Sequence, residues 1–145
     1  MTTRYIIINP PISRAERYSS KFLGAAGGSQ VPLGVLYIAS FLVNNNFDVK
    51  FIDAEHLDYL LDETILNIQK LVTDDCVFAL TSTTVCFPRA VFLAKKLKEK
   101  FPSIKIIIGG SHVSALPEQT MSFNCFDFGI IGEGEYWYGK VTRGS

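Results

Sequence analysis

The sequence lacks the features that mark several common classes of protein. Its fourteen basic and fourteen acidic side chains cancel, so no overall field draws it to nucleic acid or to an anionic membrane. No apolar run reaches the roughly 18 residues that a membrane span needs, and no cationic segment precedes a cleavable one at the N-terminus. Only three cysteines occur, Cys76, Cys86 and Cys125, and their odd number and wide spacing favour reduced core thiols over a metal or redox site. These absences predict a soluble cytoplasmic protein without nucleic-acid or membrane partners.

What is present suits a single domain. The chain has 145 residues, enough to enclose one core, and 48% of them are hydrophobic. No linker or internal repeat interrupts residues 1–139, which we expect to form that domain. Residues 140–145 carry no apolar pattern, and we expect them to be a cloning remnant outside the fold.

Short apolar runs alternate with segments of helical spacing along the chain. Most runs are continuous, which is typical of strands buried on both faces of a parallel sheet. They cover residues 5–8, 49–52, 77–80, 104–108 and 128–131, and the helical segments between them cover residues 34–43, 61–72 and 90–101. This alternation predicts an α/β domain of the doubly wound, flavodoxin-like or Rossmann-like kind, with helices on both faces of a five-stranded parallel sheet. Because five strands are visible, we favour the strand order 2-1-3-4-5.

The helix expected at residues 34–43 is apolar nearly all round. Such a helix is either deeply buried or presents a face to a partner, which could be a second copy of this chain. A further irregular stretch, residues 9–31, is rich in glycine and serine, and loops of this length are usually functional or mobile.

Small, polar or glycine-containing residues follow four of the five expected strands. Ligands of open parallel sheets bind beyond the carboxyl ends of the strands, so these residues are the candidates for a site. They are Asn9, Pro10 and Pro11; Asp53; Thr81, Ser82 and Thr83; Gly109, Gly110, Ser111 and His112; and Gly132 and Glu133. The glycine pair could let a ligand approach the backbone or could form a plain turn, and the hydroxyl cluster could equally cap a helix.

Several kinds of site are disfavoured by what the strand ends omit. Asp53 resembles the acidic residue that binds ribose in dinucleotide enzymes, but the first turn reads Asn9-Pro10-Pro11 instead of G-x-G-x-x-G. His56 and His112 lie too far from each other and from any thiol to form a recognisable metal set. We therefore expect no metal ligands and no catalytic residues in this chain.

Taken in order, these segments resemble the cobalamin (B12)-binding domain at the N-terminus of many B12-dependent radical SAM enzymes. The matching pieces are Asn9-Pro10-Pro11, residues 32–39 (PLGVLYIA), Asp53-Ala54, Thr81-Ser82, Gly109-Gly110-Ser111-His112, Pro117-Glu118 and residues 132–135 (GEGE). Each piece is short, but seven in the correct order form a fairly specific set. The resemblance implies a corrin over the strand ends, with its nucleotide tail beside the sheet near Ser82 and the glycine pair. It adds Leu33 and Gly34 to the strand-end residues as cofactor contacts.

The resemblance also implies a partner that this chain lacks. In the family, a following catalytic half holds a [4Fe–4S] cluster and S-adenosylmethionine through a C-x-x-x-C-x-x-C run, and that run is absent here. The chain should therefore be a cofactor module that is not catalytic alone, from a parent enzyme of methyl transfer or related radical chemistry. The loop after the first strand also lacks the D-x-H-x-x-G of other cobalamin domains, which implies cobalamin bound with no protein histidine on the cobalt.

Two other functions remain to be weighed against this one. A degenerate domain of the same fold could serve as a scaffold or substrate-recognition unit without cofactor, and it would keep the same glycines. A receiver-like signalling domain is disfavoured, because it needs paired carboxylates after its first strand and a lysine after its last.

Overall fold

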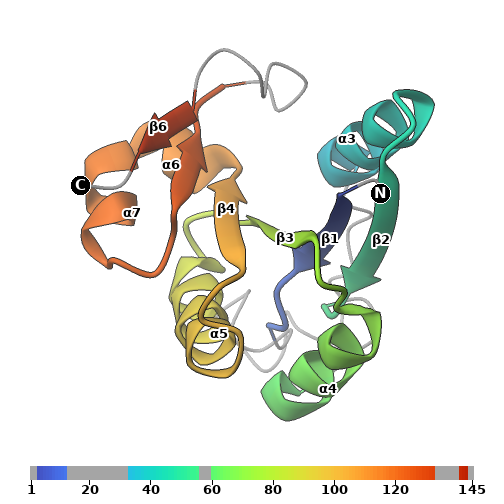
Figure 1. The fold of residues 1–145 in the computed structure, drawn as a ribbon. Helices are drawn as coiled ribbons and strands as arrows, with labels where there is room; N and C mark the ends of the chain where they lie inside the picture. Colours follow the sequence, from blue (N-terminus) through green and yellow to red (C-terminus); the bar gives the residue numbers. More distant parts are fainter. Residues whose placement is uncertain (1–2, 13–32, 56–59, 133–140, 144–145) are drawn as a thin grey trace, which may run out of the picture.

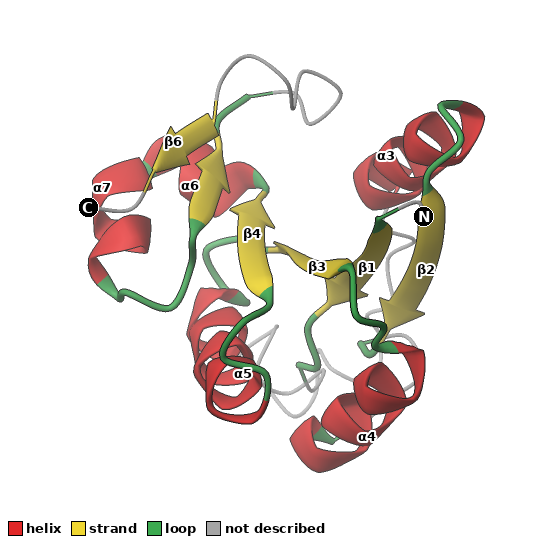
Figure 2. Ribbon diagram, in the orientation of Figure 1, coloured by secondary structure: helices red, strands yellow, loops and turns green. Residues whose placement is uncertain are grey.

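The computed structural model describes residues 3–12, 33–55, 60–132 and 141–143, which form one sheet with helices on both sides (Figure 1). The strands are β1 (Arg4–Asn9), β2 (Asp48–Asp53), β3 (Cys76–Thr81), β4 (Lys105–Gly109), β5 (Phe128–Ile130) and β6 (Val141–Arg143). The helices are α3 (Leu33–Asn44), α4 (Leu61–Leu71), α5 (Phe87–Lys100), α6 (Ser111–Ala115) and α7 (Pro117–Ser122). Strands and helices alternate through the first five strands (Figure 2).

The sheet has the order β2-β1-β3-β4-β5-β6, and its first five strands are parallel. The predicted five-stranded parallel arrangement and its order are thus confirmed. A sixth strand, β6, pairs antiparallel with β5 and comes from the segment that we expected outside the fold. Its three residues are too few to show a periodic pattern, although Val141 and Thr142 are β-branched and suit a strand.

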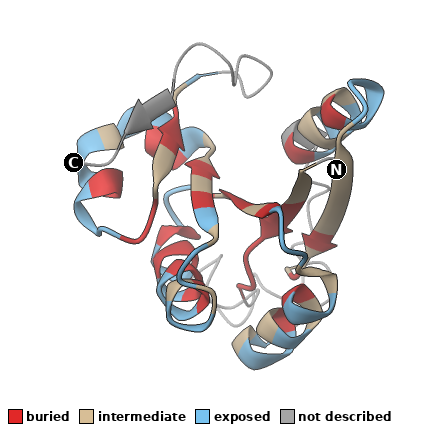
Figure 3. Cartoon of the chain, viewed as in Figure 1, coloured by how far each residue is buried: buried red, intermediate tan, exposed pale blue. Residues whose placement is uncertain are grey.

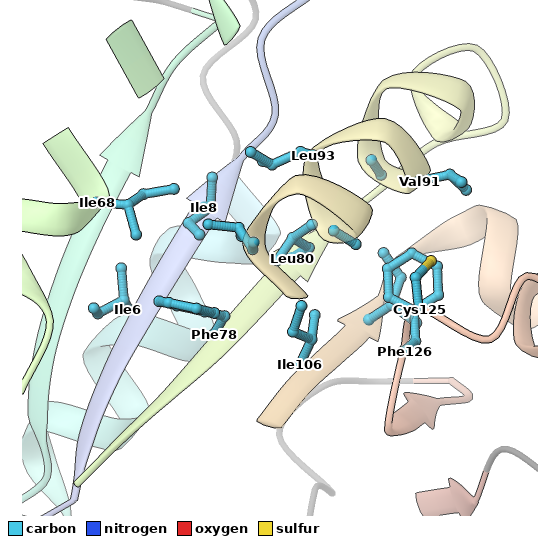
Figure 4. Packing of buried hydrophobic residues seen from close by; sticks show 14 of the residues in the cluster. Ile6, Ile8, Ile68, Phe78, Leu80, Val91, Leu93, Ile106, Cys125 and Phe126 are labelled. Atoms are coloured by element: carbon cyan, nitrogen blue, oxygen red, sulfur yellow. The ribbon is translucent and has the colours of Figure 1, made fainter. Parts of the chain in front are cut away.

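The main core lies on the face of the sheet that α4 and α5 cover. Successive strand residues point to opposite faces, so Ile6 and Ile8 of β1 and Phe78 of β3 share this side. Figure 4 shows them packed toward Ile68 of α4 and Leu93 of α5. The buried stripe of α5, which the spacing predicted, supplies most of the helical contribution.

Among the residues that the structure describes, α3 covers part of the opposite face. Val35 and Leu42 of α3 pack with Ile7 of β1 and Ala79 of β3 in a second, smaller core that contains no residue of β4 or β5. The central strands β1 and β3 are largely buried, whereas the outer sides of the helices are exposed (Figure 3). The helix α3, which is apolar nearly all round, buries one side and leaves Tyr37 and Val43 exposed on the other.

A charged cluster at the start of β4 and β5 joins α5, β4 and the segment that leads into β5. The Lys98 ammonium of α5 donates to the Asp127 carboxylate at 2.6 Å, and the same carboxylate accepts the N–H of Ile106 in β4 at 2.8 Å. Burial alone would raise the pKa of Asp127, but these two hydrogen bonds and the charges of Lys98 and Lys105 outweigh it and hold the pKa below its ordinary value.

Within these described segments, no helix is both long and apolar enough to cross a membrane.

Candidate functional site

A cavity of about 280 Å³ opens at the carboxyl ends of the strands, on the face of the sheet that carries α3. It lies between α3 and the part of this face formed by β1, β3, β4 and β5, beside the smaller core. It is lined by Ile7, Val35, Ile38, Ala79, Leu80, Thr81, Ile107, Gly109, Gly110 and Ile130. Most of these side chains are aliphatic, so the cavity favours an apolar group over a polar one.

Two glycines at the end of β4 have different roles in this cavity. Gly110 has φ +107° and ψ −178°, and a Cβ there would lie 2.5 Å from the carbonyl oxygen of Ser82 and 2.9 Å from its nitrogen. Only glycine permits this backbone conformation and this contact. A Cβ on Gly109 would instead meet nothing closer than the Cβ of Ile130, at 3.9 Å. Gly110 therefore allows two loops to touch, and Gly109 leaves room beside the cavity wall.

Ser82 is the partner of this glycine pair. Its N–H donates to the carbonyl of Gly109 at 3.0 Å, which extends the β3–β4 ladder by one bond beyond Thr81. The side chain is only 2% exposed, and its hydroxyl donates to the carbonyl of Thr83 at 2.7 Å. The structure thus brings together Thr81, Ser82, Gly109 and Gly110, which the sequence analysis placed in one site.

Asn9 and Asp53 meet at the ends of β1 and β2. They are register partners, and the Asn9 amide donates to Asp53 at 2.8 Å and to Glu55 at 3.4 Å. Asn9 is 8% exposed, and the following Pro10 and Pro11 are buried as well. With both amide hydrogens donated to carboxylates, Asn9 fixes the orientation of the two acids at the rim of the sheet.

His112 lies at the start of α6, buried on the side away from the cavity. Its Nδ1 is 3.2 Å from the hydroxyl of Thr84, its Nε2 is 3.0 Å from Oε1 of Gln119, and its ring stacks on Phe87 at 3.8 Å. The side chain is only 3% exposed and is absent from the cavity lining. His112 is among the cofactor contacts predicted from the sequence, and in the structure its ring contacts other side chains of the protein.

The other predicted site residues are dispersed. Thr83 and Ser111 are exposed, and the Gly132 N–H donates to the hydroxyl of Ser114 at 3.0 Å. Leu33 and Gly34 begin α3, but their surroundings lie outside what the structure describes. Glu133, and residues 13–31 of the long glycine-rich stretch, also lie outside the described residues.

The aliphatic lining of the cavity was missed by sequence reasoning. Ile107 and Ile130 read as ordinary core positions, because a buried strand and a strand facing an apolar cavity have the same composition. The available signal was the alternation itself. Ile106 and Ile108 face the α4 and α5 side, so Ile107 must face the opposite side, which carries α3.

The three cysteines are buried free thiols, as expected of core residues. Burial raises the pKa of Cys125 to about 11, although the positive charges of Lys95 and Lys98 oppose the shift. Among the residues that the structure places, no three potential ligands gather into a metal site.

Comparison with known proteins agrees with this geometry. The model of the B12 binding domain matches residues 20–141. A protein of Pyrococcus horikoshii named "Uncharacterized methyltransferase PH0819" is 32% identical over 140 residues, which are 96% of this chain and 28% of that protein. The chain belongs to the B12-binding domain family, and it spans little more than a quarter of this relative.

The residues at the strand ends fit part of a cobalamin. Ligand pockets usually measure roughly 300–1,000 Å³, so a cavity of about 280 Å³ is too small for a corrin but suited to a smaller apolar group. The nucleotide tail of cobalamin ends in such a group, an apolar benzimidazole. The bare backbone at Gly109 leaves the entrance without a side chain, which suits a ligand that must lie close to the sheet.

Proposed function

We propose that this chain is the cobalamin-binding module of a larger B12-dependent radical SAM enzyme, with the corrin over the strand ends and the nucleotide tail in the cavity. The observation that carries the proposal is the aliphatic cavity beneath Gly109 and Gly110, which opens at the edge of the sheet where parallel α/β domains bind ligands. Membership of the B12-binding family supports cobalamin as the ligand.

The cavity would hold the tail by burying an apolar ring against Ile107 and Ile130. Removal of apolar surface from water stabilises such a complex by about 25 cal/mol per Å². The rim of the sheet would supply the polar contacts, since the carboxylates of Asp53 and Glu55, oriented by Asn9, can accept hydrogen bonds from the amide side chains of a corrin. Bound cobalamin would supply the methyl-carrying chemistry.

We further propose that no histidine of this chain binds the cobalt. Both ring nitrogens of His112 contact other side chains, and the ring is buried away from the cavity. The sequence after β1 contains no histidine between residues 10 and 32. His56, the second histidine, follows β2 and lacks the spacing of the known cobalt-binding loop.

The catalytic partner in this proposal is a radical SAM domain, with a [4Fe–4S] cluster and S-adenosylmethionine, that follows in a cytoplasmic parent enzyme. The matched relative is named a methyltransferase, and the match covers only 28% of its length, which leaves ample chain for such a domain. The exposed side of α3, formed by Leu36, Tyr37 and Val43, is the surface we assign to that domain. Self-association of the isolated chain through this surface would contradict the assignment.

Titration with hydroxocobalamin, followed by its visible spectrum, tests the proposal. The bound cofactor should show the base-off spectrum, and the spectrum should be the same in His56→Ala and in His112→Phe. A spectrum of histidine ligation would contradict the assignment of the cobalt ligand. No binding at several hundred micromolar would favour the scaffold function instead.

A pair of variants at Gly109 localises the tail. Gly109→Ala adds a Cβ with no neighbour closer than 3.9 Å and should bind cobalamin almost normally. Gly109→Val places two further methyl groups beside Ile130 and should weaken binding at least about tenfold, because they occupy space that the tail needs. Equal binding by the two variants would place the tail elsewhere.

A further inference from the structure

His112 connects parts of the chain that are far apart in sequence. Its imidazole contacts Thr84 in the loop after β3, Phe87 at the start of α5 and Gln119 in α7, while its own backbone belongs to α6. In the tautomer that donates from Nε2 to Gln119, Nδ1 accepts from the Thr84 hydroxyl, so every polar atom of the buried ring is satisfied. The ring has no hydrogen-bonding capacity left for a ligand.

The same residue is coupled to the entrance of the cavity through its backbone. The N–H of His112 donates to the carbonyl of Ser82 at 3.3 Å, and the N–H of Ser82 donates to the carbonyl of Gly109 at 3.0 Å. The side chain and the backbone of His112 thus hold the segment from Ser82 to Thr84 at two points, two residues apart. That segment is also the one that meets Gly110, where a Cβ would lie 2.5 Å from the Ser82 oxygen.

We propose that His112 is a positioning residue for the nucleotide tail: it fixes the loop after β3 against the turn after β4 and so sets the width of the cavity entrance. This inference rests on the cobalamin binding proposed above. It gives His112 an effect on the ligand without contact to it. A histidine that only fills the core would lower stability and leave the preference between ligands unchanged.

The test compares cobalamin with cobinamide, a corrinoid that lacks the nucleotide tail. His112→Phe keeps a ring to stack on Phe87 and removes both side-chain hydrogen bonds. Thr84→Val removes only one of them, from an exposed position where folding is not at risk. We expect His112→Phe to weaken cobalamin binding about five- to thirty-fold, Thr84→Val to weaken it less, and both to leave cobinamide binding within about twofold.

Thr64→Val is the matched control. Thr64 is fully buried, and its hydroxyl donates to the carbonyl of Leu60 at 2.9 Å, but α4 contributes no residue to the cavity. This variant should be destabilised like the others and bind both corrinoids as the unsubstituted chain does. Equal weakening of both corrinoids by His112→Phe, or no weakening of either, would overturn the positioning role while leaving the proposed function intact.

Failure of the unsubstituted chain to bind any corrinoid would refute the proposed function, so the role of His112 needs a readout without cofactor. Amide hydrogen exchange supplies it. Exchange at Ser82, whose N–H donates to the carbonyl of Gly109, should be faster in His112→Phe than in Thr64→Val when the two are compared at equal global stability. Equal exchange at this amide would refute the idea that His112 holds the entrance.

Discussion

Replacement of Gly110 by alanine should destabilise the domain more than any other single methyl group added near the cavity. The residue has φ +107° with an extended ψ, a region essentially restricted to glycine, which costs another residue about 1–3 kcal/mol. The new Cβ would also lie 2.5 Å from the oxygen of Ser82, so the two backbones must separate by about 0.9 Å to reach the 3.4 Å of ordinary contact. The atoms of Ser82 that the new Cβ would meet belong to the backbone, so no rotamer change relieves the overlap.

That separation would weaken two hydrogen bonds, from Ser82 to Gly109 and from His112 to Ser82. Together with the strain, we expect a loss of about 2–4 kcal/mol in the free energy of unfolding, measured by urea denaturation. Gly109→Ala is the control, and it should leave stability unchanged or raise it by up to about 1 kcal/mol. Similar stabilities of the two variants would refute the assignment of different roles to the two glycines. Any loss of cofactor binding in Gly110→Ala would therefore reflect displacement of the loop after β3.

Three further predictions concern stability and thiol reactivity. Asp127→Asn should lower the free energy of unfolding by about 1.5–3 kcal/mol near neutral pH. The lowered pKa of Asp127 gives stability that is lost in acid, so the unfolding curves of the two proteins should converge as pH falls below about 4. A constant difference down to pH 2 would contradict this. The Cys125 thiol, with its pKa raised to about 11, should react with a thiol reagent at pH 8 only after denaturant is added, and prompt reaction in the native protein would show that it is accessible. Phe78→Ala should cost about 3–5 kcal/mol by denaturation, since Phe78 is completely buried between α4 and α5; a loss below 1 kcal/mol would mean that the core refills.

Much of the fold was accessible from the sequence because buried parallel strands produce continuous apolar runs. Residues 5–8 and 77–80 identified β1 and β3 to within a residue or two at each end. The helices α6 and α7 were not predicted, because five or six residues are too few to show a helical period. The strand β6 was missed for the same reason.

Some features of the candidate site could be predicted from single residues, and others depend on the fold. Ser82 and the pair Gly109-Gly110 lie together in the structure, as their positions after β3 and β4 predicted. The role of His112 could not be read from the sequence, since only the fold brings Thr84 and Gln119 to its two nitrogens. The cavity was also hidden, because it depends on how α3 packs against the sheet, which the sequence does not show.

Calorimetric titration of the unsubstituted chain with cobalamin and with cobinamide tests the central claim most directly. If the cavity takes the nucleotide tail, cobalamin should bind at least about tenfold more tightly than cobinamide, and this difference should disappear in Gly109→Val. Equal affinities of the unsubstituted chain for the two corrinoids would contradict the claim, since the tail would then contribute nothing to binding.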